Sequence, residues 1–139
     1  MSTAMFADLS AVELIDLELA YAPQYGSAKD AINMIGYIAD SIINTDDKLV
    51  TPSEIARSKV LDVRTPEEYE QGSIPGSLNI QLDDLRDRIE EVRAFADSKE
   101  IVVTCQYGQR GHSAVRLLIQ HGVQAANLSD GYETWVANL

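Results

Sequence analysis

The sequence is poor in cysteine, in long apolar runs and in positive charge. Its 139 residues include one cysteine, Cys105, which excludes an intramolecular disulfide and a zinc site built from several cysteines. No stretch approaches the roughly 20 consecutive apolar residues that span a bilayer, and the N-terminus lacks the pattern of a secretion signal. Lys and Arg number 11 against 22 Asp and Glu, so a general surface for nucleic acid or anionic lipid is not expected. We therefore expect a cytoplasmic protein with no nucleic-acid or membrane partner.

A polar cluster at residues 44–48 divides the chain into two regions, residues 1–45 and residues 46–139. In the first region, Ser10 and Glu13 form a capping-box pattern ahead of an apolar run, and isoleucines recur at near-helical spacing in residues 28–43. Two short helices joined by an irregular loop at residues 21–27 bury little apolar surface by themselves. We expect this helical segment to pack on something else.

The second region alternates strand and helix patterns. Short apolar runs predict strands at residues 48–51, 60–63, 101–104 and 124–128. Capping signals and spacings of three or four predict helices that begin at Pro52 and that cover residues 66–70, 82–95, 112–121 and 132–136. Strands separated by helices indicate an α/β fold with a central parallel sheet. Acidic residues alternate with arginines along residues 82–95, which is typical of a solvated face, so no metal site is expected there.

The most reactive position in this pattern is Cys105, directly after the strand predicted at residues 101–104. The six residues that follow it lead into the helix predicted to start near His112, and Gly108 and Gly111 let the backbone curl so that N–H groups point inward. Ligands bind at the carboxyl edge of open α/β sheets, and a helix N-terminus adds positive potential there. With the charge of Arg110, this loop would stabilise a Cys105 thiolate and hold an anion beside it.

A second interpretation of Cys105 stays open, because a lone cysteine at the end of a strand is most often a small buried hydrophobe. The sequence offers Cys105 no evident base. His112 and His121 are the only histidines, and both are better explained as solvated helix residues than as members of a Cys-His dyad.

Several motifs of the second region resemble the rhodanese, or sulfurtransferase, domain in that family's own order. The resemblance covers about residues 48–139 and rests on four segments: Leu61-Asp62-Val63-Arg64, Pro66-Glu67-Glu68-Tyr69, residues 72–80 and the Cys105 loop. It implies a three-layer fold with helices on both faces of a central parallel sheet. It also implies that Cys105 accepts a sulfane sulfur as a persulfide. The loop would stabilise the anion through the side chain of Arg110 and through its own backbone. The loop residues concerned are Gln106, Tyr107, Gly108, Gln109 and Gly111.

Loop length distinguishes two chemistries on this fold. Related cell-cycle phosphatases need five residues between cysteine and arginine, whereas four separate Cys105 from Arg110, and the tighter loop favours sulfur over phosphoryl transfer. Two residues depart from the common pattern: Gln106 where many members have arginine, and Gly111 where they have serine or threonine. The loss of a local cation weakens the case for thiosulfate as the natural donor. Asp62 and Arg64 are expected to support the loop through an ion pair rather than by direct catalysis.

The first region resembles another family. Residues 17–30 and 33–37 are similar to the end of the dimerisation domain of flavin-dependent coenzyme A-disulfide reductases and NADH oxidases, some of which carry a C-terminal rhodanese domain. The Cys-Gln-x-Gly-x-Arg-Gly loop of those fusions matches residues 105–111 and accounts for both departures. The resemblance implies that the chain is a C-terminal fragment of such a fusion, and that the parent uses FAD, NAD(P)H and coenzyme A. No Gly-x-Gly-x-x-Gly fingerprint occurs, so we expect these residues to bind no FAD or nicotinamide cofactor themselves.

The same resemblance implies the partners. Polysulfide, coenzyme A persulfide and thiosulfate would be sulfur donors, other thiols would be acceptors, and the reductase domains or a second copy would cover the helical segment. Tyr25 matches a tyrosine that reaches toward the partner subunit's substrate site, although packing at a dimer interface explains it equally well. A different class of function also remains open, namely a rhodanese-like domain that binds or regulates a partner without catalysis.

Overall fold

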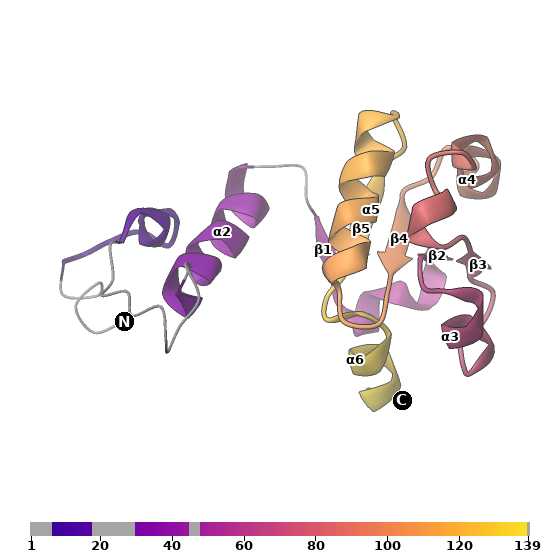
Figure 1. The fold of residues 1–139 in the computed structure, drawn as a ribbon, viewed down its shortest axis with the longest axis horizontal. Coiled ribbons are helices and arrows are strands. Elements are labelled where there is room, and N and C mark those ends of the chain that lie inside the picture. The colour runs from indigo at the N-terminus through magenta and orange to yellow at the C-terminus, as the bar shows by residue number, and fades with distance from the viewer. Residues whose placement is uncertain (1–6, 18–29, 45–47, 139) are drawn as a thin grey trace. The chain divides into compact units, whose positions relative to one another are not determined.

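The structure is a computed structural model that describes residues 7–17, 30–44 and 48–138. It forms two compact units divided between Asp46 and Asp47 (Figure 1), one residue from the boundary expected from the sequence. Each unit is described by itself. Tyr25, the loop at residues 21–27 and the predicted start of a helix at residue 28 lie outside the described residues.

The first unit contains the 3-10 helix η1 (Val12–Asp16) and the α-helix α2 (Ala31–Asn44). Ser10 and Glu13 make the reciprocal hydrogen bonds of the predicted capping box, because the Ser10 N–H donates to Glu13 Oε2 at 2.8 Å and the Glu13 N–H donates to Ser10 Oγ at 3.4 Å, although η1 itself begins one residue later, after Ala11. The buried Asn33 joins the two helices, since its Nδ2 donates to the carbonyls of Leu14 and Leu17 at 3.1 and 3.0 Å. Large apolar residues stay exposed along α2: Met34, Ile35, Tyr37 and Ile38 share one side of the helix, and Ile43 lies near its C-terminal end.

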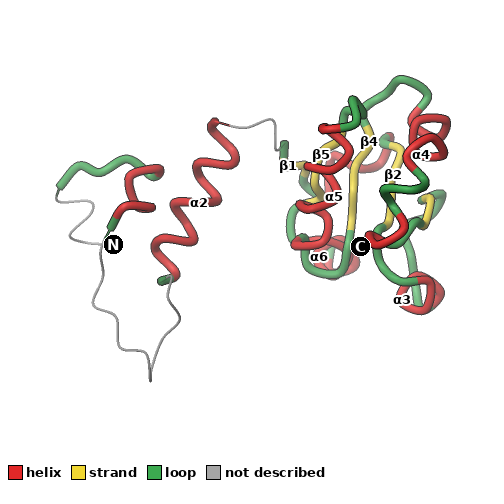
Figure 2. Tube along the Cα trace, turned by 45° about the horizontal axis from the view of Figure 1, so that its top comes forward, coloured by secondary structure: helices red, strands yellow, loops and turns green. Residues whose placement is uncertain are grey.

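The second unit is built on a five-stranded parallel sheet (Figures 1 and 2). The strand order is β1-β5-β4-β2-β3, so that β4 lies at the centre with β2 and β5 on either side. The strands are β1 (Leu49–Val50), β2 (Lys59–Asp62), β3 (Leu78–Asn79), β4 (Ile101–Thr104) and β5 (Ala125–Leu128). The connecting helices are η2 (Pro52–Arg57), α3 (Pro66–Glu70), η3 (Leu82–Asp84), α4 (Ile89–Ala96), α5 (Gln109–Gln120) and α6 (Gly131–Ala137).

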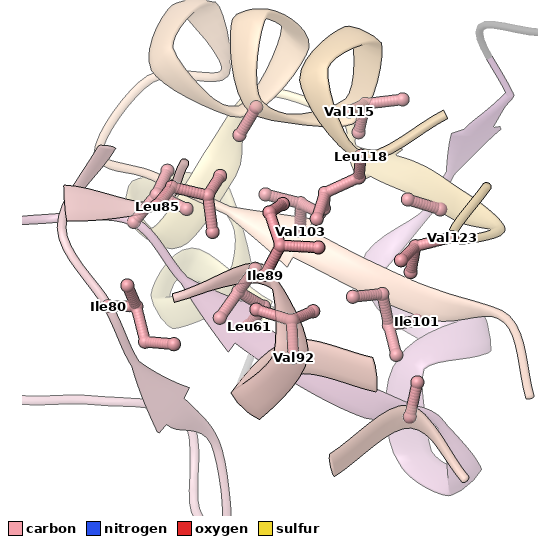
Figure 3. Close-up of a cluster of buried hydrophobic side chains, with 14 of the residues drawn as sticks. Leu61, Ile80, Leu85, Ile89, Val92, Ile101, Val103, Val115, Leu118 and Val123 are labelled. Atoms are coloured by element: carbon pink, nitrogen blue, oxygen red, sulfur yellow. The ribbon is translucent and has the colours of Figure 1, made fainter. Parts of the chain in front are cut away.

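Helices cover both faces of this sheet, which confirms the expected three-layer α/β fold. Side chains alternate across each strand, so Val103 enters one core cluster and Val102 the other. The first cluster packs α4 and α5 against the sheet and is drawn in Figure 3, where Leu118 lies over Val103. The second cluster, on the opposite face, packs η2 and α6 against the sheet. All four residues of β4 are buried, because the strand is central and covered on both sides.

The four strands predicted from apolar runs are confirmed as β1, β2, β4 and β5, whereas β3 was missed because its two residues, Leu78 and Asn79, include a polar one and form no apolar run. The continuous helix predicted at residues 82–95 is wrong, since the structure has η3, a turn at residues 85–88 and then α4. At Arg88 the backbone leaves the helical region, with φ −110° and ψ 20°. The apolar spacing of three and four misled the prediction, because two short helical pieces bury the same side chains as one long helix.

The helices of the described residues include none whose length and apolar character would let it cross a membrane.

Candidate functional site

The candidate site lies at the carboxyl end of the central strand β4. Cys105 follows Thr104, the last residue of β4, and its side chain is buried with 1% of its surface exposed. The backbone N–H of Gly108 points back at the thiol and lies 3.1 Å from Cys105 Sγ. A hydrogen bond from a backbone N–H stabilises a negative charge on sulfur more than it stabilises a neutral thiol. The first turn after the strand is therefore shaped around Sγ.

The loop holds this shape because groups outside it bind its carbonyls. The N–H of Tyr132, in the first turn of α6, donates to the Cys105 carbonyl at 2.7 Å, and the N–H of Glu133 donates to the Gln106 carbonyl at 3.3 Å. Gly108 itself has φ +92°, a left-handed conformation that a side chain would strain. These contacts turn the loop carbonyls toward α6 and β5 and leave the N–H of Gly108 to face the sulfur.

The helix α5 starts closer to Cys105 than the sequence predicted. It begins at Gln109 rather than near His112, and its first backbone hydrogen bond runs from the His112 N–H to the Gly108 carbonyl at 3.0 Å. The N–H groups of Gln109, Arg110 and Gly111 therefore precede the hydrogen-bond ladder of the helix. The positive end of the helix dipole lies directly beyond the loop that holds Cys105 Sγ.

Arg110 is not a free cation in this structure. Its two terminal nitrogens donate to the two carboxylate oxygens of Glu68, on α3, at 2.8 Å each. This hydrogen bonding lowers the pKa of Glu68 to about 2, and the same bonds raise the pKa of Arg110, with a further contribution from the negative potential of Cys105. Sequence reasoning quoted Glu68 within a motif but did not connect it to Arg110, which is 42 residues away.

Asp62 and Arg64 form the ion pair that the sequence predicted, and both are buried, 0% and 2% exposed. The two oxygens of Asp62 accept from Arg64 Nε and Nη2 at distances of 2.8 to 3.1 Å. Arg64 Nη1 also donates to Gln106 Oε1 at 3.1 Å, and its guanidinium lies 4.0 Å from the ring centre of Tyr132. Because Gln106 Nε2 in turn donates to Glu133, both ends of the Gln106 side chain are held.

Asn127, on β5, is a loop contact that the sequence analysis missed. Its Nδ2 donates to the Gly108 carbonyl at 3.1 Å, and its Oδ1 is a buried oxygen without a hydrogen bond from any described residue. A Cβ on Gly111 would lie 2.3 Å from that oxygen, so a side chain at Gly111 would require Asn127 to move. No signal in one sequence distinguishes Asn127 from other residues of a buried strand.

The remaining predicted residues fall in different places. Tyr107 is 71% exposed at the tip of the loop, and Gln109 is exposed in the first turn of α5. His121 lies at the far end of α5, where its Nδ1 is 2.8 Å from the Leu117 carbonyl. In the part of the chain that the structure describes, no three His, Cys, Asp or Glu residues gather closely enough to hold a metal ion.

Comparisons with known proteins show which family the chain belongs to. Residues 45–138 match the rhodanese-like domain. The human thiosulfate:glutathione sulfurtransferase is 33% identical over 92 residues, which are 58% of this chain and 80% of that protein. Two solved structures are similar over 96% of this chain: reduced CoADR-RHD from Bacillus anthracis, 45% identical with a TM-score of 0.85, and a NAD-dependent persulfide reductase from A. fulgidus, 32% identical with a TM-score of 0.78.

This chain spans 24% of the length of each of those two structures and 48% of the length of another curated relative. The match to the rhodanese-like domain nevertheless covers most of the chain, including β1 to α6 and the loop after Cys105. The chain belongs to the family of rhodanese-like domains.

Proposed function

We propose that the chain is a sulfurtransferase module in which Cys105 carries sulfane sulfur as a persulfide. The observation that carries this proposal is the Gly108 N–H, 3.1 Å from Cys105 Sγ, at the N-terminal end of α5. Membership of the rhodanese-like family and the likeness to thiosulfate sulfurtransferases support it. A buried structural cysteine needs no loop of this shape around its sulfur.

The transfer that this site supports needs no external oxidant or reductant. The thiolate of Cys105 attacks the outer sulfur of the donor, a bond from Sγ to that sulfur forms, and the donor's own S–S bond breaks. The electron pair leaves with the rest of the donor, as sulfite from thiosulfate or as a thiolate from a hydropersulfide. An acceptor thiolate then attacks the outer sulfur of the Cys105 persulfide and regenerates the Cys105 thiolate.

The surrounding residues act on the loop. The Gly108 N–H and the start of α5 would stabilise negative charge on Sγ and on the transferred sulfur. Arg64 and the first turn of α6 hold the loop in shape, through the Gln106 side chain and through the Cys105 carbonyl respectively. These groups need not move during transfer, which is the condition for preorganised electrostatic stabilisation.

Intact mass spectrometry tests the proposal. After brief exposure to polysulfide, the protein should gain about 32 Da for each persulfide sulfur, whereas a Cys105→Ser variant should gain none. A following incubation with a thiol, such as coenzyme A, should remove the added mass from the wild-type protein. An unmodified wild-type protein with folded, reduced Cys105 would contradict sulfur carriage by this chain.

We further infer that the chain is part of a longer FAD- and NAD(P)H-dependent enzyme of the cytoplasm that reduces coenzyme A disulfide, coenzyme A persulfide or polysulfide. The likeness to the Bacillus anthracis and A. fulgidus structures extends over 96% of the chain, beyond the rhodanese-like residues. The exposed apolar residues of α2, which include Ile38 at 56% and Ile43 at 64% exposure, are suited to burial against reductase domains or a second copy.

In this proposal FAD, held by the rest of the parent enzyme, would supply the chemistry that reduces the disulfide or persulfide at the expense of NAD(P)H, and the present residues would deliver or receive the sulfur. The protein purified from its complete gene should contain flavin and oxidise NADH or NADPH with coenzyme A persulfide as substrate. The Cys105→Ser change should impair turnover with polysulfide more than turnover with coenzyme A disulfide. A complete protein without bound flavin would contradict the inferred parent and leave the role of Cys105 unaffected.

One observation favours the second candidate function, a non-catalytic binding or regulatory domain. Cys105 is 1% exposed and belongs to the core cluster that includes Val63 and Val103, as a structural cysteine would. The mass measurement distinguishes the two functions, because a binding domain would acquire no sulfur that a thiol can remove.

A further inference from the structure

Each of the two arginines at the Cys105 loop is paired with a carboxylate. The loop's own cation, Arg110, is held by both oxygens of Glu68, and the other guanidinium at the loop, Arg64, is held by both oxygens of Asp62. A further carboxylate, Glu133, accepts from Gln106 at the edge of the same loop. The two arginines and three carboxylates therefore carry a net negative charge before the Cys105 thiolate is counted.

The two ion pairs differ in how firmly they are fixed. Arg64 and Asp62 are buried and also hold the fold of the loop, so their charges are unavailable to a ligand. The side chains of Arg110 and Glu68 are about one-third exposed, at 35% and 33%. Arg110 is thus the cation that an incoming anion can approach, and Glu68 is the charge that opposes this approach.

Donors of sulfane sulfur differ in charge where they meet the thiolate. Thiosulfate is a dianion and releases sulfite, another dianion, so its transfer places three negative charges near Sγ. An alkyl hydropersulfide carries at most one charge on the transferred sulfur and releases a monoanionic thiolate. In a partly exposed site, a carboxylate several ångströms away repels a dianionic donor more than a monoanionic one, and this difference changes the relative rates of the two donors by about a factor of ten.

We propose that Glu68 is a specificity-determining residue: by pairing with Arg110 it disfavours dianionic donors such as thiosulfate and favours alkyl hydropersulfides. This inference rests on the proposed role of Cys105 as a sulfur acceptor. Glu68 does not touch the reacting sulfur and acts through Arg110. The same pairing explains why an arginine in the loop need not make the site a general anion site.

The Glu68→Gln variant removes the charge and keeps the fold. Glu68 Oε2 also accepts from the Thr65 N–H at 2.9 Å, as the far member of the capping box of α3. Glutamine fills that position in capping boxes equally well, because its amide oxygen accepts the same bond. Glu67, the preceding residue of α3, is a carboxylate on the same helix without a part in the Arg110 pair, so Glu67→Gln is the matched control for loss of one charge.

The experiment measures initial rates of persulfide formation on Cys105 in the 139-residue chain, by intact mass, with two donors. The donors are thiosulfate and the hydropersulfide of 2-mercaptoethanol, which has no charge apart from the reacting sulfur. Glu68→Gln should raise the ratio of the thiosulfate rate to the hydropersulfide rate about tenfold, and Glu67→Gln should leave it within about twofold of the wild type. Added salt should lower the thiosulfate rate of Glu68→Gln more steeply than that of the wild type.

A second pair of variants separates specificity from folding. In an Arg110→Gln background the carboxylate of Glu68 has lost its partner, so Glu68→Gln should change the donor ratio by a different factor than in the wild-type background, and the difference between the two factors measures the coupling of Glu68 to Arg110. Equal ratios in Glu68→Gln and Glu67→Gln, with both donors still loading Cys105, would overturn the role of Glu68 and leave the proposed function standing. Failure of both donors to load the folded wild-type protein would overturn the proposed function, and this inference with it.

Discussion

Gly131, the first residue of α6, is the most sensitive contact between that helix and the Cys105 loop. A Cβ at this position would lie 2.3 Å from the Cys105 carbonyl oxygen and 2.8 Å from the Gln106 carbonyl oxygen. Both are backbone atoms that cannot rotate away. The backbone at Gly131 also has φ +69°, which alone costs an alanine about 1–2 kcal/mol.

Relief of this overlap requires α6 to move off the loop. The movement would lengthen the hydrogen bond from the Tyr132 N–H to the Cys105 carbonyl, now 2.7 Å, at a cost of about 1 kcal/mol. Repacking around the added methyl group adds about 1–3 kcal/mol. Gly131→Ala should therefore lower the free energy of unfolding by about 3–6 kcal/mol, and it should slow persulfide formation on Cys105 because the loop loses its shape.

Two other glycines provide matched controls. Gly76 and Gly122 have φ +79° and +76°, and no atom of the described residues lies within 4 Å of a Cβ placed on either. Alanine at these positions carries the backbone strain without the overlap and should cost about 1–2 kcal/mol. Urea unfolding followed by circular dichroism measures all three variants. If Gly131→Ala is no more destabilising than the two controls, α6 does not hold the loop as argued.

Three further outcomes follow from the same contacts. Arg64→Ala leaves a buried, unpaired carboxylate and should lower the free energy of unfolding by about 3–5 kcal/mol in urea, and a loss below about 1 kcal/mol would contradict the role of the pair. The hydrogen bonds from Arg110 lower the pKa of Glu68 to about 2. After solvent screening, the ion pair therefore contributes about 0.5 kcal/mol to the free energy of unfolding above pH 4.5, and this contribution is lost as the pH falls toward 2. The stabilities of the wild type and Glu68→Gln should converge over that interval, and a gap that stays constant with pH would argue against the pair. Gly111→Ala should destabilise the protein by about 1–2 kcal/mol through its overlap with Asn127. Adding Asn127→Ala should remove the overlap, so the double variant should be destabilised by less than the sum of the two single variants, as measured by thermal unfolding.

The parts of the fold that could be predicted are those in which neighbouring residues carry the information. Residues 101–104 are apolar because β4 is buried on both faces, and a strand of that kind is visible in any window that contains it. Capping boxes at Thr51 and Thr65 are equally local, since the partner carboxylate lies three residues away. The break at Arg88 was missed because it preserves the apolar spacing on which the helix prediction depended.

The candidate site divides in the same way. Cys105 and the ion pair of Asp62 with Arg64 were predicted, because a cysteine after a buried strand and two charges two residues apart are visible in the sequence. The contacts of Glu68 and Asn127 were not, since each joins the loop from another element of the sheet or its connections. Tertiary hydrogen bonds of this kind have no periodicity, so one sequence without relatives carries no signal for them.

Asn127 and Glu68 explain two features of the loop, the glycine at position 111 and the pairing of Arg110. The oxygen of Asn127 occupies the space that a side chain at Gly111 would need. Asn127 also holds the Gly108 carbonyl, which helps to direct the Gly108 N–H toward the sulfur of Cys105. Glu68 compensates the arginine that remains in the loop, and Gln106 carries no charge of its own. The departures at Gln106 and Gly111 therefore act in one direction: they make the loop less attractive to dianions while keeping the N–H donor that the proposed Cys105 persulfide would need.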